Sequence, residues 1–278
     1  MAQTPDTDQP PVLDMSVLNQ PCAWNCVATG YADVIAAHLA HYSADAIAMA
    51  KLTADDLVLD VATGPGTLSR QAARITTVHA IDFSQEMLQE LRQRATLQEL
   101  DRLHLQHADG QALPFEDDTF DAGFSMFGLF MFPDRAKGFA ELARVIRPGG
   151  RAVVASWQPR ETIPAFSIIG QEVAQIADIP ITAGVQPLAH ADVFKTEMSA
   201  AGFDVTVHAV THTWQAPSLD HLWAELERSH VVLCQCAQQM PAPQYADLRR
   251  HIRAKLEEAL GTGPQNIAMP AWMAFGQL

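Results

Sequence analysis

Long apolar runs are missing from this sequence of 278 residues, although 48% of its residues are hydrophobic. A helix that crosses a bilayer needs about 20 consecutive apolar residues, so the sequence predicts no membrane span. The stretch MAQTPDTDQPPVLD at the N-terminus lacks the basic and apolar regions of a signal peptide. We therefore expect a cytoplasmic protein in which residues 1–20 form a mobile arm.

Basic side chains are also scarce, with 18 Lys and Arg against 32 Asp and Glu and a formal net charge of −14. Association with a nucleic-acid backbone depends on basic side chains that release counterions, so this charge argues against a nucleic-acid partner. The one basic cluster, residues 249–255, is interpreted as the solvated face of a helix. A small molecule is the expected partner, and a monomer and a homodimer both stay open.

Cysteine is rare, with four residues at Cys22, Cys26, Cys234 and Cys236. Neither pair has the spacing of a common zinc site, although two such pairs could converge on a soft ion. In a cytosolic chain thiols are expected to be reduced. We therefore expect no metal site and no disulfide, with the cysteines serving as packing residues.

What the sequence does contain is an apolar strand that runs into a loop of small residues. Residues 57–61 form a short apolar run with Asp60 near its end, and Gly64 and Gly66 follow. Glycines lower the bulk where a chain turns and let a ligand approach the backbone. The loop predicts a nucleotide-sized ligand, but Asp60 would repel a pyrophosphate and suits a cationic ligand or a bound water.

Three further segments follow at the spacing of successive strand–helix units. Residues 78–82 predict a strand ending in Asp82, whose carboxylate can accept from both hydroxyls of a ribose. Residues 107–110 close a third strand and place Asp109 where it can accept from an adenine amino group. Residues 120–127 predict a fourth strand, and 151–157 a fifth. This alternation predicts an α/β fold with a mainly parallel sheet and a ligand at the carboxyl ends of its strands.

The order of these motifs resembles that of class I S-adenosylmethionine-dependent methyltransferases. The resemblance covers residues 57–157 and is carried by VLDVATGPGTLS, AIDFSQEML, HADGQALPFEDDTFDAGFSMFGLF and ELARVIRPGGRAVVASW. It is greatest to the small-molecule branch that includes the ubiquinone and menaquinone biosynthesis methyltransferases. It implies a Rossmann-like sheet of seven strands in the order 3-2-1-4-5-7-6. Ala62 stands where many members of the family have the first glycine of the loop. Beyond Trp157 the sequence no longer resembles the quinone-biosynthesis branch, so no quinone substrate is implied.

The resemblance also implies S-adenosylmethionine as cofactor and roles for individual residues. The loop of Gly64 and Gly66 would pass under the methionine moiety and Asp82 would bind the ribose. The remaining cofactor-binding residues implied are Phe83 and Met87 beside the adenine, Asp109 and Gly110 at its edge, Ser125 and Phe127 near the sulfonium, Tyr31 at the cofactor carboxylate, and Asp60 and Ala62 next to the loop.

The rest of the chain divides around residues 53–157, the expected cofactor-binding core. Residues 21–52 predict lid helices, with a break near Ala44 and with Trp24 and Tyr31 on one helical face. Residues 158–195 are interpreted as a cap insertion. Residues 196–278 predict two C-terminal strands that enclose a helical insertion over 216–262.

The expected reaction is transfer of a methyl group, by in-line displacement, to a small aromatic or hydrophobic acceptor. Positioning alone can supply about 7 to 11 kcal/mol, so no catalytic residue is assigned; the histidines considered as a base are His38, His41, His190 and His230. An aromatic and apolar lining around the sulfonium is expected from Trp24, Phe124, Met126, Phe127, Phe130 and Phe132. An acceptor pocket is expected from Trp157, Phe166, Trp214, Trp223 and His230.

Two alternatives stay open. One is a catalytically silent protein that binds S-adenosylmethionine or S-adenosylhomocysteine, because the acidic residues argue for binding and not for turnover. The other is an NAD(P)-dependent oxidoreductase, which also combines a glycine loop with an acid about twenty residues on. Ser69 in place of a third glycine, and Asp60 before the loop, argue against it.

Overall fold

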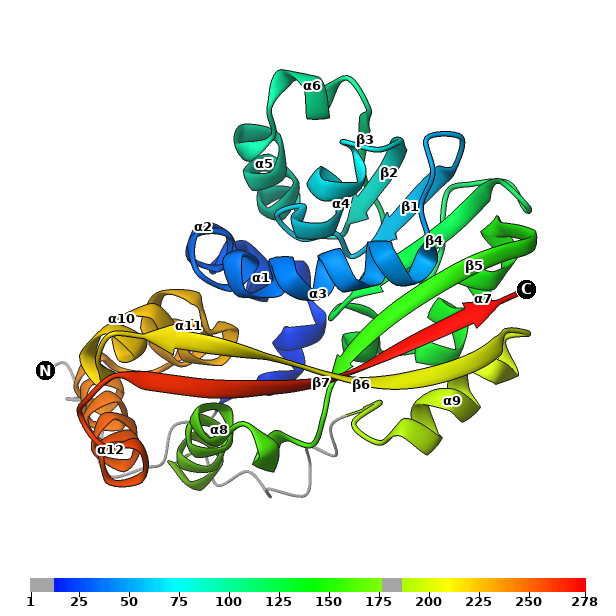
Figure 1. Cartoon of the computed structure of the whole chain (residues 1–278). Coiled ribbons are helices and arrows are strands. Elements are labelled where there is room, and N and C mark those ends of the chain that lie inside the picture. Colours follow the sequence, from blue (N-terminus) through cyan, green and yellow to red (C-terminus); the bar gives the residue numbers. More distant parts are fainter. Residues whose placement is uncertain (1–12, 177–186) are drawn as a thin grey trace, which may run out of the picture.

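A seven-stranded sheet forms the centre of the computed structural model, which describes residues 13–176 and 187–278 (Figure 1). Its strands lie in the order β3-β2-β1-β4-β5-β7-β6. Their bounds are Leu57–Val61 for β1, Thr77–Asp82 for β2, Leu103–His107 for β3, Phe120–Met126 for β4, Ile146–Trp157 for β5, Asp204–Ala216 for β6 and Gln265–Gln277 for β7. The Rossmann-like fold and its strand order are therefore confirmed.

The central strands are buried on both faces, as expected for a parallel sheet covered by helices. β1 pairs in parallel with β2 and β4, and β4 pairs in parallel with β5. β7 is antiparallel to both of its neighbours, β5 and β6. Because β1, β2 and β4 run in the same direction, the loops that follow them lie together at one edge of the sheet.

Helices cover both faces of the sheet. α3 (Ile35–Ala50) and α4 (Thr67–Ala72) pack against each other on one face, and α7 (Arg135–Val145) and α9 (Ala191–Ala200) cover the other (Figure 1). α5 (Gln85–Arg94) packs on β2 and β3, and α6 (Leu97–Leu100) lies beside β3. α9 was expected partly within a cap insertion over 158–195, but it packs on β6 and β7 and so belongs to the sheet's own helical layer.

β6 and β7 continue well beyond the end of β5. β5 pairs with β7 over Ala271–Gln277, whereas β6 pairs with β7 over all 13 of its residues. The result is a two-stranded ribbon that carries α10 (Leu219–Ser229), α11 (Val231–Gln239) and α12 (Ala242–Leu260) at its end (Figure 1). The helical insertion is therefore held next to the N-terminal helices α1 and α2, which are distant from it in sequence.

The N-terminal segment is divided differently from the expectation. It forms η1 (Met15–Asn19), α1 (Pro21–Asn25) and α2 (Ala28–Asp33), and α3 then continues through Ala44 without a break. The chain bends at Val34, whose φ of −111° and ψ of −67° lie outside regular helix. Residues 13–20 do not form a free arm, because Leu13 is buried and η1 packs on α11. Residues 1–12 lie outside the described part of the chain.

The segment after β5 contains η3 (Arg160–Thr162) and α8 (Pro164–Ile176), which packs against α12. Residues 177–186 of the expected cap lie outside the described residues. Among the described helices, none combines the length and the apolar character that a membrane crossing requires.

Candidate cofactor and acceptor site

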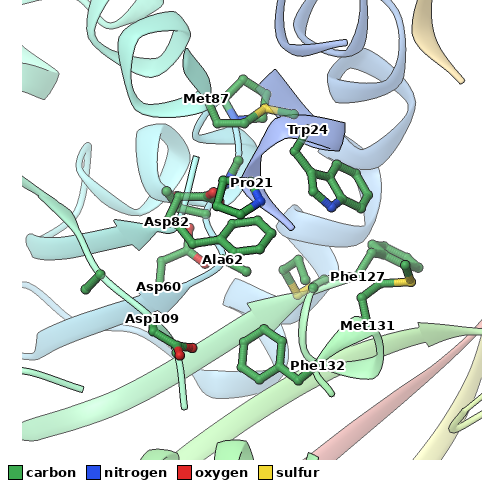
Figure 2. Close-up of a pocket in the computed structure, with 18 of the residues that line it drawn as sticks. Pro21, Trp24, Asp60, Ala62, Asp82, Met87, Asp109, Phe127, Met131 and Phe132 are labelled. Atoms are coloured by element: carbon green, nitrogen blue, oxygen red, sulfur yellow. Dashed lines mark hydrogen bonds between the residues drawn. The ribbon is translucent and has the colours of Figure 1, made fainter. Parts of the chain in front are cut away.

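A cavity of about 470 Å³ opens at the carboxyl ends of β1, β2 and β4. Residues of η1, α1 and α2 line it as well, and we call these three elements the lid helices, or the lid. Figure 2 shows Asp60, Asp82 and Asp109 toward one wall and Trp24, Phe127 and Met131 toward the other. We call these the carboxylate wall and the apolar wall. The cavity is therefore formed by the strand ends of the sheet together with N-terminal helices that lie outside the sheet.

The loop after β1 is shaped by three residues with left-handed backbones. Ala62 has a φ of +56°, Gly64 of +56° and Gly66 of +79°. This conformation costs a glycine little, whereas a residue with a Cβ is strained by about 1 to 2 kcal/mol. A glycine would suit position 62 better, and the methyl group of Ala62 instead packs where Gly128 leaves room. The strain at Ala62 lies directly on the cavity wall.

Asp60 is buried below this loop. One of its oxygens, Oδ2, accepts hydrogen bonds from Thr63 Oγ1 at 2.7 Å and from Ser69 Oγ at 2.6 Å. Burial raises the pKa of Asp60 to about 6, against the lowering effect of these two hydroxyls. Ser69 occupies the position where a dinucleotide-binding loop has its third glycine, and its hydroxyl is used to bind the Asp60 carboxylate. Asp60 holds the loop in shape and still reaches the cavity.

Asp82 ends β2 and connects two neighbouring loops. Its Oδ2 accepts from the backbone N–H of Gly64 at 2.8 Å, and its Oδ1 accepts from that of Ser84 at 2.9 Å. Each carboxylate oxygen has a further lone pair that can accept from a ligand hydroxyl. Burial raises the pKa of Asp82 to about 6. The geometry suits recognition of two adjacent hydroxyls, as on a ribose.

Asp109 is the most exposed of the three carboxylates. It follows β3 by two residues and accepts from the backbone N–H of Gln111 at 2.8 Å. Gly110 next to it has no space for a side chain, because a Cβ there would meet Phe132 Cζ at 2.5 Å. His107 ends β3, and its Nε2 lies 2.9 Å from the carbonyl oxygen of Phe83. The exposed side chains of His107 and Asp109 form a polar rim of the cavity.

The lid is fastened to α5 by polar contacts at a regular spacing. Ser84 Oγ donates to Asn25 Oδ1 at 2.7 Å, and Thr29 Oγ1 donates to Glu90 Oε1 at 2.6 Å. A third contact is the ion pair of Asp33 with Arg94, at 2.7 Å. These three contacts hold α1 and α2 against the start and the outer face of α5.

Trp24 and Tyr31 come from two different helices and not from one helical face as expected. α1 ends at Asn25, and the bend before α2 brings the two rings edge to face at 6.1 Å between centroids. Both side chains line the cavity together with Met87 of α5. Burial, and then the proximity of Asp82, raise the pKa of the Tyr31 hydroxyl, which keeps it a hydrogen-bond donor at neutral pH.

Most of the residues implied as cofactor-binding line this one cavity. They are Tyr31, Asp60, Ala62, Gly64, Asp82, Phe83, Met87, Asp109, Gly110 and Phe127. Two do not. Gly66 lies beneath the wall, where a Cβ would meet Leu91 Cδ1 at 2.0 Å, and Ser125 is buried with its Oγ accepting from the backbone N–H of Leu129 at 3.1 Å. Both shape the loops that form the site.

The expected acceptor pocket is not formed by the residues proposed for it. Trp157, Phe166, Trp214, Trp223 and His230 are all absent from the cavity lining. Trp214 is buried, donates to Glu225 and stacks on His38, and Trp157 stacks behind Phe127. Trp214 packs there because β6 turns it toward His38 of α3. His38, His41 and His190 do not line the cavity either, nor do Phe124 and Phe130.

Residues without a motif complete the cavity in their place. Leu18, Asn19, Gln20 and Pro21 approach from the N-terminal segment, and Met131 from η2 (Leu129–Met131). The proline at the first position of α1 marks a helix start. No sequence pattern indicates that this start would lie over the strand ends.

The cysteines differ from the expectation of four reduced thiols. Cys26 at the end of α1 forms a disulfide with Cys234 of α11, 208 residues away in sequence. Cys22 is free and exposed, and Cys236 is free and buried. Only the return of the ribbon insertion to the lid brings the pair together. No group of three or more ligating side chains suited to a metal occurs within residues 13–176 and 187–278.

Comparisons with known proteins agree with this geometry. Residues 58–150 match the profile of a methyltransferase domain. The demethylmenaquinone methyltransferase of Thermus thermophilus is 33% identical over 184 residues, which cover 60% of this chain and 82% of that protein. The uncharacterized protein Rv1405c of Mycobacterium tuberculosis is 46% identical over 101 residues, which span 36% of this chain and only 36% of that relative's length.

The crystal structure of the YcgJ protein from Bacillus subtilis superimposes with a TM-score of 0.59 at 18% identity, covering 85% of this chain and 98% of that one. Such a likeness shows the shared fold. The matched domain contains the loop after β1 and the carboxylates of β1 and β2, which lie on one cavity wall. The chain therefore belongs to the family of class I S-adenosylmethionine-dependent methyltransferases.

Proposed function

We propose that this protein binds S-adenosylmethionine in the cavity and transfers its methyl group, by in-line displacement, to a small aromatic or hydrophobic acceptor. The observation that carries the proposal is the pair of buried carboxylates, Asp60 and Asp82, at the ends of adjacent parallel strands beside a loop without side-chain bulk. In this arrangement Asp82 accepts from the ribose hydroxyls. Asp60 holds the loop and reaches a water or the cationic end of the ligand.

The other lining residues take the roles that their positions suggest. Gly64 lies under the methionine moiety, and Tyr31 donates its hydroxyl to the cofactor carboxylate. Phe83 and Met87 flank the adenine, while Asp109 and Gly110 meet its edge. Phe127 stands beside the sulfonium, where an aromatic face favours a positive charge. The rings and methionines of the apolar wall then contact the acceptor.

No residue is assigned as a general acid or base. The sulfonium already carries an activated methyl group, so the task of the protein is to hold an acceptor lone pair in line behind it. The lid that closes the cavity provides this positioning and excludes water from the reacting atoms.

Calorimetric titration with S-adenosylhomocysteine and with NAD tests the cofactor. We expect saturable binding of S-adenosylhomocysteine and none of NAD. Asp82→Ala should weaken binding by at least about 100-fold, because two hydrogen bonds to a charged acceptor contribute about 1.5 to 3 kcal/mol each. Asp204→Ala, which removes an exposed carboxylate at the start of β6, serves as the control. Normal affinity in Asp82→Ala would refute the ribose assignment.

Methyl transfer is tested separately with labelled S-adenosylmethionine. Label in a small-molecule product supports an enzyme. Binding of cofactor with no transfer to phenols, amines, thioethers, quinols or carbon acids would instead favour a silent binding protein.

A further inference from the structure

The cavity contains almost no positive charge. No lysine or arginine occurs among the described residues that line it, and His107 is the one histidine there. The stretches outside the description, residues 1–12 and 177–186, contain no Lys, Arg or His in their sequence. Three carboxylates, Asp60, Asp82 and Asp109, line the same space. The formal charge of the chain, −14, has the same sign.

An acceptor with a carboxylate or phosphate would therefore be held poorly. An anion that leaves water for an apolar site loses its hydration, and only opposite charge or hydrogen-bond donors make up for that loss. The apolar wall offers neither, because the indole N–H of Trp24 already donates to the carbonyl oxygen of Leu18 at 2.9 Å. His107 is exposed at the polar rim, on the side of Asp109 and Phe83 and away from the apolar wall. The field of the protein adds repulsion at longer range.

The apolar wall of Trp24, Phe127 and Met131 also offers no side chain to take a proton from the acceptor. Tyr31 contacts Trp24 of that wall, but burial raises the pKa of its hydroxyl, which therefore keeps its proton. His107 and Asp109 are exposed at the polar rim, and the lining residues Asn19, Gln20 and Ser43 have no basic side chain. Asp60 is occupied by Thr63 and Ser69. Asp82 accepts from two backbone N–H groups and, in the proposed function, from the ribose. The acceptor atom is therefore expected to have a lone pair that can attack without loss of a proton.

We propose that the acceptor is an apolar aromatic molecule without an anionic group, which attacks through a neutral pyridine-type nitrogen or a thioether sulfur. This inference rests on the proposed function. The acceptor lone pair forms a bond to the methyl carbon as the bond from that carbon to the cofactor sulfur breaks. The bonding pair returns to sulfur, the positive charge passes to the product, and no proton is released.

This chemistry fits a cavity with fixed charges. The reacting pair holds one positive charge before, during and after the transfer, so the same surroundings stabilise every stage. Aromatic faces attract a cation within about 6 Å, and Trp24 and Phe127 lie on the apolar wall with the polarizable Met131 (Figure 2). Transfer to an anion would instead remove the charge and would need a cationic residue to hold the acceptor.

Four probes of similar size distinguish these chemistries: quinoline, methyl naphthyl sulfide, naphthol and naphthoate. Each is incubated with the full-length protein and methyl-labelled S-adenosylmethionine, and the labelled product is identified by mass spectrometry. We expect label in quinoline or in the sulfide at a rate at least about tenfold above naphthol, and none in naphthoate. Label mainly in naphthol or naphthoate overturns the inference, as does no label in any probe with protein that binds S-adenosylhomocysteine. Protein that does not bind S-adenosylhomocysteine contradicts the proposed function instead.

A variant tests the charge argument without turnover. Met131→Arg places a cation on the apolar wall, and Met131→Leu changes packing there without charge. The readout is the ratio of naphthoate to quinoline affinity in protein saturated with S-adenosylhomocysteine. We expect Met131→Arg to raise this ratio at least about tenfold above that of Met131→Leu, as one close charge pair in a partly buried site can do. Equal ratios in the two variants would overturn the inference.

Discussion

The two walls of the cavity are built in different ways. The carboxylate wall comes from consecutive strand–helix units of one sheet, and its acids are held by hydrogen bonds within a few residues of the strand ends. The apolar wall combines α1 with the loop after β4 and η2, which are distant from it in sequence, and α1 is held by packing on α5 and by the hydrogen bond of Asn25 with Ser84. Rigid strand ends suit the constant part of a reaction, the cofactor. A wall of separate segments suits the part that differs among relatives, the acceptor.

The largest expected effect separates two tryptophans. Trp214 is 1% exposed and outside the cavity, so Trp214→Ala should lower the free energy of unfolding by about 3 to 5 kcal/mol. Trp24 is half-buried on the apolar wall, and Trp24→Ala should cost less stability while weakening S-adenosylhomocysteine binding about tenfold. Urea denaturation and calorimetry measure the two quantities. Similar losses of stability in both variants would contradict the division between core and wall.

Two glycines of one loop sharpen the comparison within the carboxylate wall. Gly66→Ala should lower the free energy of unfolding by about 3 kcal/mol, because its Cβ would press on the buried side chain of Leu91. Gly64→Ala has free space around it and should cost about 1 kcal/mol, from its positive φ alone. Cofactor affinity should change in the opposite order, since Gly64 lines the cavity. A larger loss of stability in Gly64→Ala than in Gly66→Ala would contradict the assignment of Gly66 to the core and of Gly64 to the cavity.

The pH dependence of binding probes Asp82. Burial raises the pKa of Asp82 to about 6, so below that pH the carboxylate becomes protonated and loses one acceptor for the ribose. S-adenosylhomocysteine should bind roughly tenfold more weakly at pH 5 than at pH 7.5, because protons then compete with the ligand. In Asp82→Asn the affinity should be low and almost independent of pH over this range. A steep dependence that persists in Asp82→Asn would assign the titration to another group.

The raised pKa values affect the stability of the unliganded fold in the opposite direction: stability falls as the pH rises. Because the pKa values of Asp60 and Asp82 are raised on folding, their contribution to stability is full below pH 4 and is lost as the pH rises through about 6. The carboxylate wall therefore gives up stability at neutral pH in return for charged acceptors in the site.

The smallest effect concerns the lid. Arg94→Ala removes the ion pair with Asp33, which is partly exposed and contributes no more than about 1 kcal/mol. Dissociation of S-adenosylhomocysteine, followed by stopped-flow fluorescence of Trp24, should become up to about fivefold faster. Arg92→Ala, an exposed arginine on the same helix, is the control. Equal rates in the two variants would show that this contact does not hold the lid closed.

Much of the core could be predicted, because its signals are local. The apolar run of β1, the glycine loop and the acids at the ends of β1 and β2 are consecutive in sequence, and each is interpreted with its immediate neighbours. Parallel strands then bring these ends together without further information. Gly66 and Ser125 lie outside the cavity lining, because spacing along the sequence does not tell whether a residue at the end of a strand or in a loop faces the ligand or the core.

The bend between α1 and α2, the place of Met131 on the apolar wall and the Cys26–Cys234 disulfide were decided by the tertiary structure alone. Aromatic residues such as Trp157 and Trp214 look equally suited to a core or to a ligand pocket, because burial favours them in both. Whether Trp24 or Trp214 faces the cavity depends on how far the β6–β7 ribbon carries its helices back over α1. Local chemistry thus determined where the carboxylates of the strand ends lie, and long-range packing determined which apolar side chains complete the cavity.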